Sequence, residues 1–475
     1  MNSDTAELAI LDTASELAAP FPTPSGGRGS AVSVRGGWSR LRADPARMAA
    51  VSDSWRALWS SRALVWLAGV GTVLAVGFGP VRNAFNPPGV TRGFGWLGDL
   101  LAAPAARWDA AWYLVIAHYG YSPNLGSYTS ARTAFFPLYP LGLHAITLSG
   151  LPPVLAGVLL SLLALSLSLY GIHRLTVLER PLSGRSGVLR PPARDVARLA
   201  VLITAFAPMA FYFSAVYSES LYLALSVGLF LCARRGRWAA TGALGALAAA
   251  TRSAGVVLLV PALILYLYGP REDRAPDLLT AVRWRPAYRL RRDFLWLGLV
   301  PAGLGVYMAY LAGSGGDALM PFHAQAVWSR HFAGPYVGVW DGAKVAFEGV
   351  RQLFSQGHRV YFPAAGGSPD IDAGHNLMLL AFLLAAVPMI VGVLRMLPLA
   401  YGVYVILALA LPLSYPVASQ PLMSLPRFLV VLFPLSIWLA AWLTAHPRAR
   451  VPALMGSGLL MAFFVAQFAT WHWVA

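Results

Sequence analysis

Long apolar runs alternate with short polar or basic segments along most of the chain, and this alternation predicts membrane-spanning helices. A helix that crosses a bilayer needs roughly 20 predominantly apolar residues. Eleven segments approach that length, and they lie at about 62–80, 152–173, 196–214, 217–233, 237–251, 254–269, 294–312, 376–394, 398–413, 428–444 and 451–470. The pattern predicts an all-α, polytopic integral membrane protein with about 11 transmembrane helices.

Two long loops and an N-terminal segment lie outside these runs. The loops, 81–151 and 313–375, contain aromatic and apolar stretches that predict helices lying on the membrane. Residues 1–61 are rich in Ala, Gly, Ser, Pro and Arg and have no apolar run long enough for a cleaved signal sequence. We expect a disordered tail over 1–61 and one transmembrane domain over 62–475.

The composition excludes a soluble globular protein. Of the 475 residues, 57% are hydrophobic and 12% are charged, whereas a soluble chain carries about 25% charged residues. Cys232 is the single cysteine, so the chain can form neither an internal disulfide nor a cysteine-based zinc cluster.

The formal charge of +16 by itself suggests nucleic-acid binding. The positions of the arginines relative to the predicted spans give a different explanation. In the eleven-span arrangement, 26 arginines lie in the N-terminal segment and on every second loop, and the other ten basic residues lie on the opposite side. Basic residues stay preferentially on the cytoplasmic side. The charge therefore predicts a cytoplasmic N-terminus and no nucleic-acid partner, and we expect a multi-pass protein of the cell (plasma) membrane.

Both long loops then face outward, and chemistry is expected on that face because it holds eight acidic residues. They are Asp99, Asp109, Glu219, Asp317, Asp341, Glu348, Asp370 and Asp372. The cytoplasmic loops are too short for a nucleotide-binding domain, and no glycine-rich phosphate loop is present. The substrate is therefore not expected to be a cytoplasmic nucleotide.

The first outer loop contains a tryptophan-rich segment around a carboxylate. On a continuous helix, Trp108, Trp112 and Tyr119 would share an interfacial face, while Asp109 and Tyr113 would project from another. The segment is also typical of an amphipathic helix anchored by aromatic residues, with the aspartate simply solvated. The aromatic neighbours favour a partly desolvated carboxylate and make Asp109 the candidate catalytic residue.

Three arginines on the outer side are candidates for binding an anionic substrate. Arg132 opens a proline-aromatic turn that is also compatible with a purely structural role. Arg252 lies between the two short spans, where an unpaired arginine costs about 2–3 kcal/mol, so it predicts an anionic partner. Arg427 lies at the outer end of the tenth span, where an interfacial anchor is the alternative.

The remaining candidates are single polar residues. Glu219 follows Ser218 at a predicted helix start, where the serine could cap the helix and the glutamate could complement its dipole. His323, close to Gln325, has no second ligand at a suitable spacing, so we expect a hydrogen-bonding rather than a metal-binding histidine. Asp370 and Asp372 superficially resemble a metal motif but are expected to be solvated, and neither a metal nor a cofactor is predicted.

Taken together, these segments resemble the PIG-V family of mannosyltransferases, members of the GT-C class of multi-spanning glycosyltransferases. The resemblance runs from about residue 100 to 430. It is carried by the tryptophan-aspartate segment that ends in Gly120-Tyr121, by Phe136-Pro137 with Tyr139-Pro140, by Tyr217-Ser218-Glu219-Ser220, by Thr251-Arg252-Ser253 and by Arg427-Phe428.

The resemblance implies a GT-C-like fold, a polyprenyl-phosphate mannose donor, inversion at the anomeric centre, and Asp109 as the catalytic base. The family's eukaryotic members act on a glycosylphosphatidylinositol precursor, whereas the Arg-rich, Lys-poor composition suggests a high-GC bacterium, so a glycolipid or lipoglycan acceptor is expected among the membrane lipids. Expected substrate-binding residues are Arg252, Arg427, Arg132, Glu219, Trp108, Trp112, Tyr113, Tyr121, His323 and Gln325.

Elementary chemistry agrees with this assignment. A polyprenyl phosphate is a good leaving group at neutral pH and needs positive charge rather than a general acid, whereas an acceptor hydroxyl needs a base. One carboxylate with arginines is sufficient for a single in-line displacement, while a retaining glycosidase needs two carboxylates about 5 Å apart.

A transporter or flippase of a lipid-linked sugar is the alternative, but it predicts internal repeats with paired broken helices, which the chain does not show. A non-catalytic membrane scaffold is a further alternative, but it would not explain why the charged residues cluster on one face.

Overall fold

The computed structural model describes residues 44–79, 87, 89–91, 95–121, 129–179, 193–276, 285–314, 316–355 and 368–474. The chain divides into two compact units, Met1–Met48 and Ala49–Ala475. Of the first unit, only the residues at the start of one helix are described. The second unit holds every other element.

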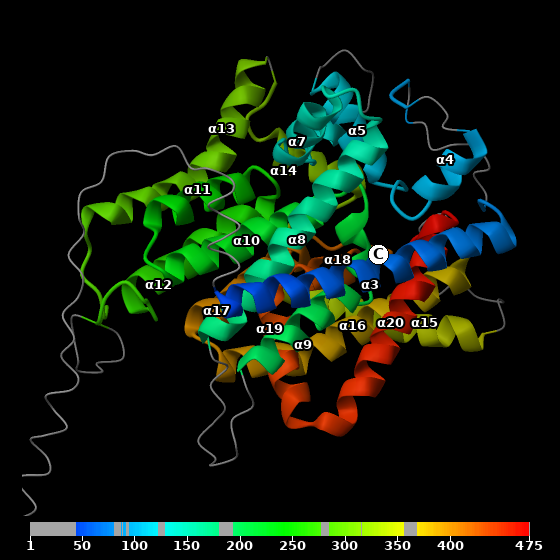
Figure 1. Cartoon of the computed structure of the whole chain (residues 1–475). Coiled ribbons are helices and arrows are strands. Elements are labelled where there is room, and N and C mark those ends of the chain that lie inside the picture. Colours follow the sequence, from blue (N-terminus) through cyan, green and yellow to red (C-terminus); the bar gives the residue numbers. More distant parts are fainter. Residues whose placement is uncertain are drawn as a thin grey trace, which may run out of the picture. The chain divides into compact units, whose positions relative to one another are not determined.

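The elements of the described residues are all helical (Figure 1). The first half of the chain forms α3 (Pro45–Val76), α4 (Gly95–Ala102), α5 (Ala110–Tyr119), α6 (Thr129–Arg132), α7 (Leu138–Thr147), α8 (Pro153–Glu179), α9 (Ala193–Phe206), η2 (Ala210–Ser214), α10 (Glu219–Arg234) and α11 (Trp238–Ala249). The second half forms η3 (Ser253–Leu258), α12 (Leu259–Tyr268), η4 (Arg292–Gly298), α13 (Leu299–Gly313), α14 (Met320–His323), η5 (Ala324–Trp328), α15 (Pro335–Phe354), α16 (Pro369–Met396), α17 (Leu399–Leu413), α18 (Leu425–Val430), α19 (Phe433–Ala445) and α20 (Pro447–Ala469).

The predicted fold class, an all-α polytopic membrane protein, is confirmed. Each of the eleven apolar segments has a helical counterpart. Five helices in the described ranges are long and apolar enough to cross a membrane: α3, α8, the continuous η4–α13, α16 and α20. Four shorter apolar helices accompany them. The number of eleven spans stays a prediction.

The helix α3 begins much earlier than the sequence predicted. It starts at Pro45, so the predicted disordered tail is wrong for residues 45–61, while residues 1–43 lie outside the described part. The Asp44 side chain accepts hydrogen bonds from the N–H groups of Ala46 and Arg47, which stabilises the first turn. The apolar pattern did not reveal this stretch because polar residues interrupt it.

Those polar residues are satisfied by partners far along the chain. Asp53 is buried and lies 3.3 Å from the ring of His173. Arg62 is buried and donates hydrogen bonds to the carbonyls of Ala205 and Ala210 and to the Ser214 hydroxyl. A buried arginine is tolerated when its donors are paired in this way.

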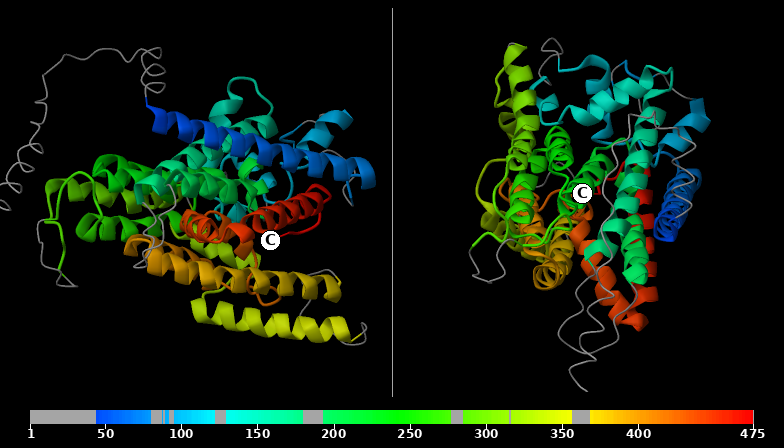
Figure 2. Two further views of the ribbon diagram at one scale, coloured as in Figure 1. Left: turned by 60° about the horizontal axis from the view of Figure 1, so that its bottom comes forward. Right: turned by 60° about the vertical axis from the view of Figure 1, so that its left-hand side comes forward.

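The central core forms where α8 packs against α7, α9 and α10. Next to it, α11 packs closely against the continuous η4–α13. A Cβ on Gly242 of α11 would lie 2.0 Å from the carbonyl oxygen of Trp296 in η4, and a Cβ on Gly303 of α13 would lie 2.0 Å from the carbonyl oxygen of Ala246 in α11. Glycine is therefore required at both positions. At another edge α15 packs along α16, as the two parallel ribbons in the left view of Figure 2 show.

The two long loops contain helices, as predicted. The first holds α4, α5, α6 and α7, and the second holds α14, η5 and α15. Their position on the membrane surface stays a prediction.

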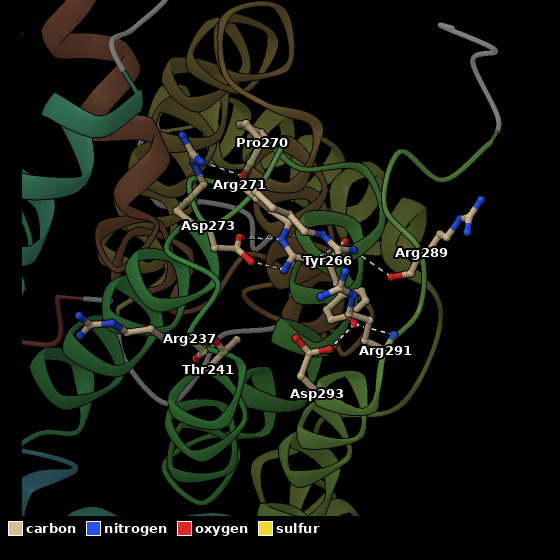
Figure 3. Close-up of polar contacts among 11 residues, drawn as sticks. Arg237, Thr241, Tyr266, Pro270, Arg271, Asp273, Arg289, Arg291 and Asp293 are labelled. Atoms are coloured by element: carbon tan, nitrogen blue, oxygen red, sulfur yellow. Dashed lines mark hydrogen bonds and ion pairs between the residues drawn. The ribbon is translucent and has the colours of Figure 1, made fainter. Parts of the chain in front are cut away.

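A polar network fixes the end of α12 (Figure 3). Arg271 donates two hydrogen bonds to Asp273, and its guanidinium lies 4.7–5.1 Å from the ring centres of Trp238, Tyr266 and Tyr288. Tyr266 also donates to Asp293. The elements η3 and α12 form one continuous helix, which begins directly after Arg252 and ends at this network. The network therefore holds the helix that follows Arg252.

Candidate active site

A tight turn before α5 positions the first candidate carboxylate. The hydroxyl of Tyr217 donates a hydrogen bond to the carbonyl of Arg107 (2.9 Å) and accepts one from the N–H of Asp109 (3.1 Å). Between them, Trp108 has a left-handed backbone with φ 55°. The predicted continuous helix is therefore wrong at this point: α5 begins at Ala110, because the buried tyrosine holds the preceding residues in a turn.

The start of α10 lies beside that turn. Tyr113 from α5 and Ser218 share a hydrogen bond of 2.8 Å between their hydroxyls. The serine makes no capping hydrogen bond, so its predicted capping role is wrong. The next residue, Glu219, begins α10 and is fully buried.

Two arginines meet at this buried glutamate. Oε1 of Glu219 lies 2.7 Å from Nε of Arg427, in the short helix α18, and 3.2 Å from Nη1 of Arg252, which precedes η3. Nη1 of Arg427 also donates to Oδ2 of Asp109 at 2.7 Å. The structure thus brings together four residues singled out from sequence, and the anionic partner expected for Arg252 is Glu219.

The arginines are held by aromatic rings as well as by carboxylates. The guanidinium of Arg427 lies 5.4 Å from the ring centre of Tyr217 and 5.7 Å from that of Tyr212. That of Arg252 lies 5.5 Å from the ring of Phe428. Stacking on rings and pairing with a carboxylate together offset the cost of burying these charges.

A cavity of about 1200 Å³ opens beside the charged cluster. Asp109, Arg252 and Arg427 contribute to its wall, whereas Glu219 lies behind them. Much of the remaining wall is aromatic and includes Trp108, Trp112, Phe135, Trp328, Trp471 and Trp473. A large apolar cavity with a few convergent charged groups is typical of a ligand-binding site.

The Asp109 carboxylate is only partly used by the protein. Its side chain is 21% exposed, and Oδ2 is held by Arg427. Within the described ranges Oδ1 accepts no hydrogen bond, and it is available to a ligand in the cavity.

The other predicted substrate-binding residues separate into two groups. Trp108, Trp112, Tyr113 and Gln325 line the cavity. Three residues lie off its wall, and the structure gives each another partner, so their role in substrate binding stays a prediction. These are Arg132, which donates to the Gly120 carbonyl at 3.4 Å, Tyr121, which donates to the Phe135 carbonyl, and His323, which lies 2.6 Å from Asp317.

The sequence analysis also missed residues of the wall. Asp372 was expected to be solvated, but it is buried and lines the cavity together with His375. Arg330 of the second outer loop, which the sequence analysis did not single out, also lies on the wall. Among the residues that the structure describes, no three His, Cys, Asp or Glu side chains lie close enough to hold a metal ion.

Comparison with known proteins agrees with the resemblance seen in the motifs. Residues 84–266 match the model of the family described as Mannosyltransferase (PIG-V). This range includes Asp109, Glu219 and Arg252, whereas Arg427, which also contributes to the resemblance, lies beyond it.

Two curated relatives bear the same name. The chain is 31% identical over 230 residues to GPI alpha-1,6-mannosyltransferase 2 of Mus musculus, an alignment that covers 46% of this chain and 41% of the relative. It is 32% identical over 187 residues to the Rattus norvegicus protein of that name, covering 37% and 35%. The chain thus spans less than half the length of these relatives. No solved structure matches the chain.

Proposed function

We propose that this chain is a membrane glycosyltransferase that transfers mannose from polyprenyl-phosphate mannose to a hydroxyl of a membrane-associated glycolipid or lipoglycan, with inversion, on the outer face of the cell membrane. The match over residues 84–266 and the names of the relatives support mannose as the sugar. The observation that carries the proposal is the carboxylate of Asp109 on the wall of a large cavity, held at one oxygen by Arg427 and, among the described residues, without a hydrogen bond at the other.

In this proposal Asp109 is the general base. Oδ1 takes the proton from the acceptor hydroxyl as its oxygen attacks the anomeric carbon, and the phosphate leaves from the opposite side of the sugar. Arg427 orients the carboxylate through Oδ2. A single base is sufficient because the donor phosphate needs no proton to leave.

The arginines supply hydrogen-bond donors. Arg252 and Arg427 place guanidinium groups on the cavity wall that can reach an anionic donor, although Glu219 and Asp109 balance their charge. The aromatic wall accommodates the apolar part of a lipid-linked sugar. The expected outward orientation rests on the placement of the arginines along the sequence.

The test is transfer of label. Membranes containing the protein are incubated with radiolabelled polyprenyl-phosphate mannose, and the labelled lipid or polymer is identified. We expect a mannosylated membrane acceptor with the wild-type protein and almost none with Asp109→Asn. If the intact donor only changes leaflet, in wild type and variant alike, the protein is a flippase and the proposal fails.

A further inference from the structure

Arg330 lies in a turn that directs it to the cavity. The 3-10 helix η5 ends at Trp328 and is followed by Ser329, whose left-handed backbone has φ 56°. The N–H of Arg330 then donates to the carbonyl of Gln325 at 3.1 Å. The same segment is tied to the end of α17, because the N–H of Ala333 donates to the carbonyl of Ser414 at 2.8 Å. The turn is thus anchored on both sides, and its side chain contributes to the cavity wall.

The charge of Arg330, unlike those of the other two cavity arginines, is not paired with any residue that the structure describes. Within the described ranges its guanidinium forms no hydrogen bond or ion pair, whereas Arg252 and Arg427 each contact a carboxylate. Its guanidinium interacts electrostatically with two charges of the site: Arg427 repels it and Asp109 attracts it. Burial lowers the pKa of Arg330 to about 10, so the group remains a cation at neutral pH.

The half-buried guanidinium of Arg330 has no anion among the described residues and lies on the cavity wall, where its N–H donors are available to a ligand. A phosphate group suits such a site, because its oxygens accept two charge-assisted hydrogen bonds at once from the planar fork of an arginine. Arg330 lines the same cavity as the proposed base, which suits the phosphate of a lipid-linked sugar whose anomeric carbon faces Asp109.

We propose that Arg330 binds the phosphate of the lipid donor and stabilises the negative charge that develops on it as the sugar leaves. This inference rests on the proposed function. In the reaction, a bond forms between the acceptor oxygen and the anomeric carbon, and the bond from that carbon to the phosphate oxygen breaks. The electron pair stays with the phosphate, which changes from a singly charged diester to a doubly charged monoester, while the acceptor proton goes to Asp109.

The additional charge needs an additional cation. Arg252 and Arg427 together face Glu219 and Asp109, so their charge is already balanced by two carboxylates. Arg330 is the cavity arginine whose charge is not shared in this way within the described residues. Its contribution should therefore increase from the bound donor to the transition state.

The experiment compares Arg330→Gln with Arg330→Lys and with Arg351→Gln as a control. Arg351 also lies on the second outer loop but forms a partly exposed ion pair with Glu348 away from the cavity wall. We expect kcat/KM for the donor to fall on the order of 100-fold in Arg330→Gln, to recover in part in Arg330→Lys, and to stay unchanged in Arg351→Gln. Unchanged donor kinetics in Arg330→Gln would overturn the inference.

A binding assay keeps the inference testable if no transfer is observed. Polyprenyl monophosphate is added to the purified proteins in detergent, and the melting temperature is measured with inorganic phosphate as the comparison. The lipid should raise the melting temperature of wild type and Arg351→Gln, and at least 10-fold more lipid should be needed for Arg330→Gln. Equal stabilisation of wild type and Arg330→Gln, or stabilisation by inorganic phosphate as strong as that by the lipid, contradicts the inference. Failure of mannose transfer by the wild type alone contradicts the proposed function instead.

Discussion

Arg427 donates a hydrogen bond of 2.7 Å to the carboxylate of Asp109, although 318 residues separate them along the chain. The same guanidinium contacts the buried Glu219 through its Nε. One side chain therefore couples the proposed base to the buried centre of the cluster, and the orientation of Asp109 depends on a helix near the other end of the sequence.

Replacing Asp109 by Asn should abolish transfer while preserving donor binding. The amide keeps the shape of the side chain but cannot accept the acceptor proton, so turnover should fall at least about 100-fold. Initial rates with labelled donor measure this, and Asp341→Asn, an acidic residue of the second outer loop away from the cavity wall, should retain near-normal rates. Normal turnover in Asp109→Asn would remove it as the base.

Glu219→Gln should destabilise the fold strongly. The substitution leaves two guanidiniums facing each other without their shared carboxylate, and breaking a buried pair costs about 3–5 kcal/mol. Denaturation in detergent measures the loss. Glu348→Gln, which breaks the partly exposed pair with Arg351, should cost about 0–1 kcal/mol.

A double variant gives a sharper form of that test. Removing Arg252 together with the glutamate, in Glu219→Gln/Arg252→Gln, should be less destabilising than Glu219→Gln alone, because one uncompensated charge is then absent. A double variant as unstable as the sum of the two single variants would show that the ion pair does not couple them.

Arg427→Lys should reduce activity although the positive charge is kept. The arginine uses two different nitrogens to reach Asp109 and Glu219, whereas a lysine has one nitrogen and cannot hold both in the same geometry. A misplaced base lowers kcat on the order of 100-fold. Steady-state kinetics with the donor measure the effect, and full activity of Arg427→Lys would show that charge alone is sufficient.

Acid should weaken the network at the end of α12. Hydrogen bonds from Arg271 hold the pKa of Asp273 below its usual value of 3.8. Because the folded-state pKa is lowered, the stabilisation is fully present above about pH 4 and is lost as the pH falls through the folded-state pKa. Melting temperatures of wild type and Asp273→Asn should differ at pH 7 and converge in strong acid. A constant difference at all pH values would contradict this.

Single cysteines test the orientation. In a Cys232→Ser background, Glu272→Cys and Lys344→Cys place thiols at two exposed positions, one in the predicted cytoplasmic loop and one in the second outer loop. A membrane-impermeant reagent added to intact cells should label Lys344→Cys and leave Glu272→Cys unlabelled until the membrane is opened. Labelling of both from the same side would reject the predicted topology.

The sequence by itself determined the fold class. Apolar runs of this length leave few solutions other than helices in a membrane, because backbone polar groups must be paired within the segment. It also identified Asp109, Glu219, Arg252 and Arg427 as candidates. Charged residues are rare in so apolar a chain, because a charge near or within the membrane is costly unless it is paired or functional. The start of α3 was not determined, because the partners of Asp53 and Arg62 lie on other helices.

Only the tertiary structure decided how these residues are used. No local pattern reveals that Glu219 contacts two arginines, that Tyr217 holds the turn before Asp109, or that Arg132 and His323 lie off the cavity wall. Arg330 acquired significance only when the structure placed it on the same cavity wall as Asp109 and Arg427, without a carboxylate of its own in the described part of the chain. The physical reason is that a charge's role depends on its burial and on its neighbours in space, and both are set by helices that the sequence separates by hundreds of residues.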